Sequence, residues 1–145
     1  MAADRPGTPA VGTRTDSTLV VVVHSDRREV ARIARIAAET GHAVISATDG
    51  RSALRQVFES SIVPSLVLTA IELPVMSGIE LAARMTAARP GLQVILLSGD
   101  PAAVDRARAH PGLAHGALLE PVDAAALRNA LTAALAAALA EELRP

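Results

Sequence analysis

The sequence predicts a single α/β domain with a doubly wound, five-stranded parallel sheet and helices on both faces. Short aliphatic runs alternate about five times with segments whose apolar residues recur at helical spacing. The first run, Leu19–Val23, is continuously apolar, which is typical of a strand buried on both faces of a parallel sheet. Right-handed crossovers between such strands place helices on both faces.

The first half of this pattern holds three strands and two helices. After the strand at residues 19–23, a helix is expected to end at Gly41, which suits the left-handed turn after a helix. Further strands are expected at residues 43–47 and 65–69. The helix between them covers residues 51–59 and is expected to bury four apolar side chains: Ala53, Leu54, Val57 and Phe58.

Turn and capping residues bound the next elements. A helix at residues 78–88 is closed by Pro90-Gly91, and a strand follows at residues 92–97. Asp100 and Pro101 are residue types expected at an N-cap and at the first helical position, so a short helix begins there and ends near residue 110.

A short strand at residues 116–119 and a helix capped by Asp123 complete the pattern. Leucine recurs at every fourth position of this helix: Leu127, Leu131, Leu135 and Leu139. Because a step of four residues drifts around a helix, two interpretations of the last two leucines stay open. Leu135 and Leu139 either cover the sheet or face outward as an interface for a homodimer.

Residues 18–141 are expected to form the domain, since 145 residues, 50% of them hydrophobic, suit one core. Residues 1–17 are rich in Pro, Gly and hydroxyl side chains, which is typical of a disordered tail. Residues 142–145 are either the chain end or the start of a linker. Neither a spanning segment of roughly 20 apolar residues nor a signal peptide is found, so we expect a cytoplasmic protein without membrane contact.

Composition excludes several classes of function. The formal net charge of -1 gives no electrostatic reason for nucleic-acid binding, and Phe58 is the only aromatic residue available for base stacking. The absence of cysteine excludes disulfides, thiolate metal sites and a cysteine nucleophile. Neither a glycine-rich phosphate loop nor a G-x-S-x-G nucleophile motif occurs, so we do not expect an enzyme.

Four segments occur in the order found in the receiver domains of bacterial response regulators. Thr48–Leu54 resembles A-x-D-G-x-E-A-L, and Ser65–Gly78 resembles P-D-L-V-L-L-D-I-x-L-P-x-M-D-G. Ile95–Gly99 resembles the strand that ends in a hydroxyl residue, and Leu118–Val122 resembles L-x-K-P-F. The resemblance implies a flavodoxin-like (CheY-like) fold with strand order 2-1-3-4-5 and a role in two-component, phosphorelay signal transduction.

The resemblance also implies a phosphorylation site, from which this sequence departs. In receivers, two acids after the first strand and an acceptor aspartate after the third hold Mg²⁺, and a lysine after the fifth binds the phosphoryl group. His24 and Ser25 replace the acidic pair, Ala70 replaces the acceptor and Glu120 replaces the lysine. The other matching positions are Asp26 beside the pair, Glu72 at the mouth, the retained hydroxyl Ser98, the switch position Ala117, and Pro121, whose preceding peptide bond is usually cis in receivers.

These departures imply a pseudo-receiver that is not phosphorylated at position 70 and binds no Mg²⁺, other metal or cofactor. We expect a protein-interaction module that works through protein partners, by dimerisation or by ligand sensing. Two alternatives stay open. The first is phosphorylation of another residue, namely His24, Ser25 or Thr69. The second is a small-molecule-binding or enzymatic domain built on the same sheet.

The polar residues expected at the strand ends have local interpretations of their own. His24 and Glu120 either pair and replace the lost ionic contact, or both are solvated. Asp26 is expected to cap a helix and Glu72 to be a solvated loop acid. Ser98 is expected to hydrogen-bond to backbone, and Thr69 to point into the core.

Overall fold

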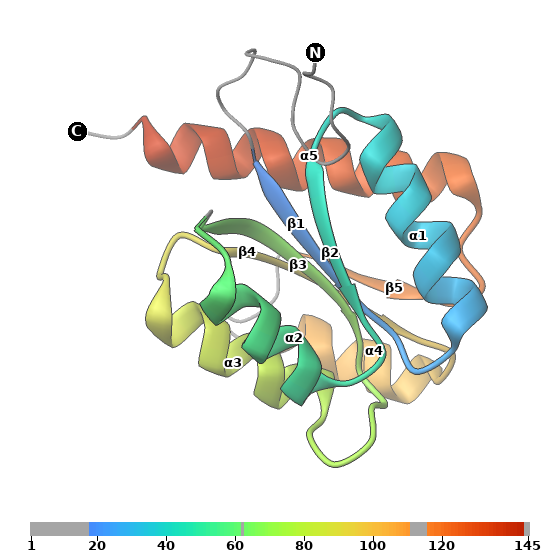
Figure 1. Cartoon of the computed structure of the whole chain (residues 1–145). Helices are drawn as coiled ribbons and strands as arrows, with labels where there is room; N and C mark the ends of the chain where they lie inside the picture. Colours follow the sequence, from blue (N-terminus) through green and yellow to red (C-terminus); the bar gives the residue numbers. More distant parts are fainter. Residues whose placement is uncertain (1–17, 62, 111–115, 144–145) are drawn as a thin grey trace.

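The computed structural model describes residues 18–61, 63–110 and 116–143, in which five strands alternate with five helices (Figure 1). In chain order the elements are β1 (Leu19–Val23), α1 (Arg27–Glu39), β2 (Ala43–Ala47), α2 (Gly50–Glu59), β3 (Pro64–Ala70), α3 (Gly78–Ala88), β4 (Gln93–Ser98), α4 (Pro101–Arg108), β5 (Gly116–Leu119) and α5 (Ala124–Glu142). The strands form one parallel sheet in the order β2-β1-β3-β4-β5. The predicted fold class and strand order are confirmed.

Each face of the sheet is covered by its own group of helices. Helices α1 and α5 lie on one face, and α2, α3 and α4 lie on the other (Figure 1). Val20 and Val22 of β1 pack under α1 and α5, while Val21 and Val23 pack on the opposite side. All five residues of β1 are buried, which explains the uninterrupted apolar run in the sequence.

The helices begin close to the predicted positions, and most of their N-cap residues are aspartates. Asp26 Oδ1 accepts hydrogen bonds from the backbone N–H groups of Arg28 and Glu29 at 2.8 and 3.4 Å, so its expected capping role is confirmed. Asp100 caps α4 ahead of Pro101, as predicted. Gly41 has φ 92°, the left-handed conformation expected after α1.

The expected burial of Phe58 is wrong, since its side chain is 76% exposed. Ala53 is a fully buried residue of α2. At about 100° per residue, Val57 lies about 40° from Ala53, whereas Phe58 lies about 140° from it. Phe58 therefore falls outside the buried face of α2 and faces the space between α2 and α3.

The rotation of about 100° per residue also explains why the two leucines whose orientation the sequence left open, Leu135 and Leu139, differ in burial. Leu135 is 9% exposed and packs in the core beneath α5, so an outward orientation is wrong for this residue. Leu139 is 56% exposed. Relative to Leu127, Leu135 is rotated by about 80° and Leu139 by about 120°, and only the latter passes the edge of the buried stripe.

The expected tail at residues 1–17 and the last two residues, 144–145, lie outside the described residues. The boundaries proposed for the domain therefore stay a prediction. Within residues 18–61, 63–110 and 116–143, none of the helices has the length and apolar character needed to cross a bilayer.

Candidate functional site

The carboxyl ends of the parallel strands bring the candidate residues to one edge of the sheet. His24 follows β1, Ala70 ends β3, Ser98 ends β4 and Glu120 follows β5. The backbone ladder continues just past these ends, because Glu120 N–H donates to the Ser98 carbonyl at 2.7 Å and His24 N–H donates to that of Ala47 at 3.2 Å. The positions of these residues at the edge are therefore set by main-chain contacts.

His24 and Glu120 form the central side-chain contact of this edge. The distance from His24 Nε2 to Glu120 Oε2 is 2.8 Å, and the side chains are only 11% and 22% exposed. Of the two interpretations that the sequence left open, the pairing is the one observed. β3 and β4 lie between β1 and β5 in the sheet, so this contact spans the ends of both inner strands.

A second contact identifies the tautomer of His24 that the geometry requires. The backbone N–H of Asp26 donates to His24 Nδ1 at 3.1 Å. Since Nδ1 accepts this hydrogen bond, the proton of a neutral ring lies on Nε2, which donates to Glu120 Oε2. Both ring nitrogens of His24 are thus engaged by neighbouring groups.

Ser98 and Glu72 form a second polar contact at the same edge. Ser98 Oγ donates to Glu72 Oε2 at 3.0 Å and accepts from the backbone N–H of Asp100, also at 3.0 Å. The expected backbone hydrogen bond of Ser98 is therefore present. Glu72 is exposed, but it also holds the Ser98 hydroxyl, a contact beyond the solvated role predicted for it.

The end of β3 offers little reactive surface. Ala70 is 3% exposed and contributes only a methyl group. Thr69 is fully buried, as expected for a core position, and its hydroxyl donates to the Ala70 carbonyl at 3.0 Å. Gly78 at the start of α3 packs against the same carbonyl, and a β-carbon at Gly78 would lie 1.9 Å from that oxygen.

β5 and the loop that follows it are tied to both layers of helices. Ala117 is buried, and its carbonyl accepts hydrogen bonds from Arg108 Nε and Nη2 of α4 at 3.2 and 2.9 Å. The peptide bond before Pro121 is cis. On the other face, Arg32 Nη2 of α1 donates to the Val122 carbonyl at 2.8 Å.

The sequence profile of the response regulator receiver domain family matches residues 20–132. The chain belongs to the response regulator receiver domain family. Members of this family are signalling modules of two-component systems and act on protein partners. No curated protein sequence matches the chain closely enough to add to this assignment.

Solved structures agree with the family assignment. The chain is similar to the signal receiver domain of an HD domain-containing protein from Pseudomonas fluorescens Pf-5, with 29% identity, a TM-score of 0.79, and coverage of 94% of this chain and 99% of that one. A receiver domain protein from Clostridium thermocellum gives 22% identity, a TM-score of 0.75 and coverage of 88% and 99%. Chemotaxis response regulator CheY4 of Vibrio cholerae gives 21% identity, a TM-score of 0.71, and coverage of 83% of this chain and 100% of that one. The last two comparisons support the fold alone.

Within this receiver domain, most of the predicted site residues converge. His24, Asp26 and Glu120 form one connected group, and Glu72 with Ser98 forms another. Ser25 is exposed on the loop after β1 and enters neither group. The sequence analysis missed the Ser98–Glu72 contact, although the strand order that it predicted already placed β4 beside β3. It also missed a groove between α2 and α3, because it assigned Phe58 to the core.

Proposed function

We propose that this receiver domain signals without aspartyl phosphorylation, as a pseudo-receiver controlled through contacts with other proteins. The observation that carries the proposal is the contact of His24 with Glu120 across the end of β3, where Ala70 supplies no carboxylate. The family resemblance implies that phosphorylated receivers have a magnesium site and a phosphoryl-binding lysine at this edge. Here an imidazole and a carboxylate bind each other instead.

The poor fit of the candidate nucleophiles at this edge supports this proposal. A methyl group at Ala70 cannot accept a phosphoryl group. The Thr69 hydroxyl is fully buried and hydrogen-bonded to the Ala70 carbonyl. His24 has both nitrogens engaged. Ser25 is exposed, and among the described residues neither of the two side-chain groups at this edge includes its hydroxyl.

The acids at this edge do not fit the magnesium ion that the family implies. Mg²⁺ requires octahedral oxygen ligands, usually including one or two carboxylates. The Asp26 carboxylate caps α1, Glu72 holds Ser98, and Glu120 holds His24. Among the residues that the structure describes, no three His, Cys, Asp or Glu side chains lie together in a group that could hold a metal ion. We propose that the domain binds no Mg²⁺ and catalyses no reaction of its own.

The output of such a domain would lie on its surface, in the cytoplasm of a bacterial cell. Leu139 is a candidate contact residue on α5, since it is 56% exposed and Leu143 beyond it is 74% exposed. Self-association through this end of α5 would bury both side chains. Size-exclusion chromatography with light scattering tests this part of the proposal, because Leu139→Gln would lower the fraction of any dimer while Arg106→Gln on α4 would not.

Incubation with acetyl phosphate and Mg²⁺, followed by intact mass measurement, tests the proposal directly. We expect no added phosphoryl mass under conditions that label a phosphorylatable receiver run in parallel. An added phosphoryl group on the wild-type chain would overturn the proposal. Its loss in His24→Ala, Ser25→Ala or Thr69→Val would then identify the acceptor.

A further inference from the structure

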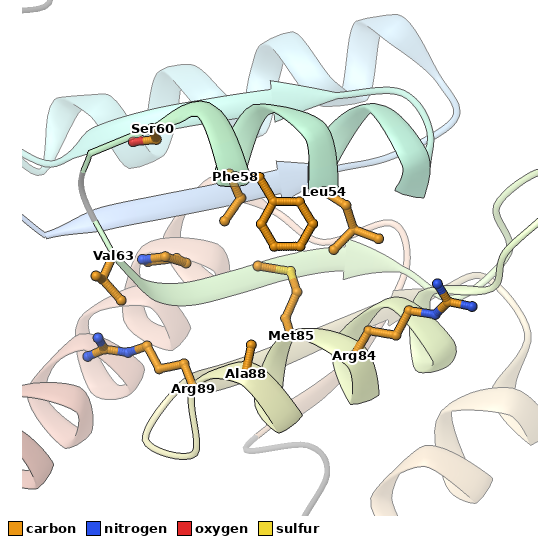
Figure 2. Close-up of a pocket in the computed structure, with 10 residues that line it drawn as sticks. Leu54, Phe58, Ser60, Val63, Arg84, Met85, Ala88 and Arg89 are labelled. Atoms are coloured by element: carbon orange, nitrogen blue, oxygen red, sulfur yellow. The ribbon is translucent and has the colours of Figure 1, made fainter.

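A groove lies between α2 and α3, at the opposite end of β3 from Ala70. This open groove has a volume of about 310 Å³, and Pro64, the first residue of β3, is among the residues that line it. Leu54 and Phe58 of α2 form one wall, and Met85 of α3 forms part of the other (Figure 2). This volume is at the lower end of the range for small-molecule sites, which are commonly lined by apolar side chains with a few polar groups.

The groove gathers apolar surface that the fold leaves in water. Phe58, the only aromatic residue of the chain, is 76% exposed, and Val63 on the same groove is 56% exposed. An isolated exposed apolar side chain needs no explanation, but an apolar hollow with an exposed ring at its rim is typical of a binding surface. A ligand body covering Phe58 would remove that surface from water.

In the described part of the groove lining, the cationic groups lie on the α3 side. Figure 2 shows Arg84 and Arg89 at the two ends of the hollow, with the apolar side chains between them. Arg84 Nη2 contacts Glu80 at 3.0 Å in a pair that is more than half exposed on the arginine side, and such helix pairs contribute only a few tenths of a kcal/mol. Arg89 Nη2 contacts Glu142 of α5 at 3.1 Å.

Both guanidinium groups can therefore serve an anionic ligand. A guanidinium carries five N–H donors, and each of these ion pairs uses a single nitrogen. Among the described residues that line the groove there is no carboxylate, although Glu80 and Glu142 pair with the two arginines. A ligand with an apolar body and one terminal carboxylate would place its body against Phe58 and Met85 and its charge beside Arg84.

We propose that the α2–α3 groove binds a small amphipathic carboxylate, such as a medium-chain fatty acid. The volume of about 310 Å³ suits a small molecule, and the arginines favour an anion over a neutral or cationic ligand. The site is lined by residues of α2 and α3 together with Ser60, Val63, Pro64 and Arg89. It therefore stands whether or not the strand-end edge of the domain takes part in phosphotransfer.

Octanoate is a suitable probe, with 1-octanol and octylammonium as neutral and cationic analogues. The Phe58 ring gives the only aromatic side-chain NMR signals outside the histidines, and Met85 is one of three methionines. We expect octanoate to shift the signals of Phe58 and Met85 while the methyl of Met76, outside the groove, stays unchanged. A ligand of about ten heavy atoms should bind with Kd of about 1 mM.

Matched variants separate the groove from the rest of the surface. Ala88→Trp should fill the groove and abolish octanoate binding, whereas Ala87→Trp, one residue away on α3 and outside the lining, should leave it unchanged. Arg84→Gln should weaken octanoate binding about threefold without changing the binding of 1-octanol, because a partly exposed ion contact is worth about that factor.

Three outcomes would overturn the proposal. The first is binding of 1-octanol or octylammonium as tight as that of octanoate. The second is unchanged octanoate binding in Ala88→Trp. The third is a shift of the Phe58 and Met85 signals with protein concentration alone, which would show that a second copy of the chain occupies the groove. None of these results depends on acetyl phosphate labelling, so the two proposals fail separately.

Discussion

His24 and Glu120 lie 96 positions apart in the chain, and their side chains meet at 2.8 Å across the ends of the inner strands. The contact joins the loop that enters α1 to the loop that enters α5, the two helices covering one face of the sheet. Because Asp26 N–H holds the opposite ring nitrogen, the imidazole is fixed at both ends. The pair therefore works as a crosslink between two loops.

A double-mutant cycle on His24→Ala and Glu120→Gln measures the strength of this crosslink. We expect a coupling of about 0.5–1 kcal/mol, above that of a surface pair because both side chains are mostly buried. Urea unfolding at constant pH gives the four free energies of unfolding. The exposed pair Arg84 and Glu80 is the matched control and should couple by no more than about 0.5 kcal/mol. Additive effects at His24 and Glu120 would contradict a functional crosslink.

Ala70→Asp alone is expected to leave the domain unphosphorylated and less stable. The position is 3% exposed, so a carboxylate there loses hydration with neither Mg²⁺ nor a lysine to replace it, at a cost of about 1–3 kcal/mol. Ala70→Asn, of similar shape but uncharged, should cost less. Acetyl phosphate labelling and urea unfolding check both parts.

A variant that combines four substitutions at the same site is expected to be phosphorylated, unlike Ala70→Asp alone. His24→Asp, Ser25→Asp and Glu120→Lys, added to Ala70→Asp, restore the carboxylates and the cation that the family resemblance calls for. This variant should gain Mg²⁺-dependent phosphorylation. Labelling of the single Ala70→Asp variant would show that the other three departures do not matter.

Most of the fold could be predicted from local patterns in the sequence. The apolar run of β1, the aspartates that cap the helices and the glycine after α1 are each read from a few neighbouring residues, and the structure agrees with them. Periodicity was less informative at the edges of the buried stripes. Phe58 and Leu135 have the same hydrophobic character, yet a difference of some tens of degrees around the helix exposes the first and buries the second.

The site was predictable in position more than in its contacts. Strand order brings His24 and Glu120 to one edge of the sheet. Because they follow the non-neighbouring strands β1 and β5, whether their side chains meet depends on how the loops after these strands curve over the sheet. The acceptor of Asp26 N–H and the partner of Ser98 depend on the same loop geometry. Spacing along the chain carries no signal for these contacts.

Val75→Gly is expected to raise stability by about 0.5–1 kcal/mol. Val75 has φ 70°, a left-handed conformation that costs a non-glycine residue about 1–2 kcal/mol, and it is 96% exposed, so it loses no buried contacts when truncated. The added freedom of glycine in the unfolded chain offsets part of the gain. Val75→Asn should give a smaller increase in the urea midpoint. A decrease for Val75→Gly would mean that the valine side chain makes a stabilising contact.

Gly78→Ala is expected to be the most damaging small substitution at the end of β3. The new β-carbon would lie 1.9 Å from the Ala70 carbonyl oxygen. The backbone at residue 78 cannot easily move away from this clash, because Gly78 N–H also donates to the Ile71 carbonyl at 2.8 Å. Helix α3 would have to move from β3, at a cost of about 3 kcal/mol in the free energy of unfolding. Gly99→Ala is the matched control, since a β-carbon there meets no atom within 4 Å and should change stability by no more than about 0.5 kcal/mol. Equal urea midpoints for the two variants would show that α3 does not pack this closely on the end of β3.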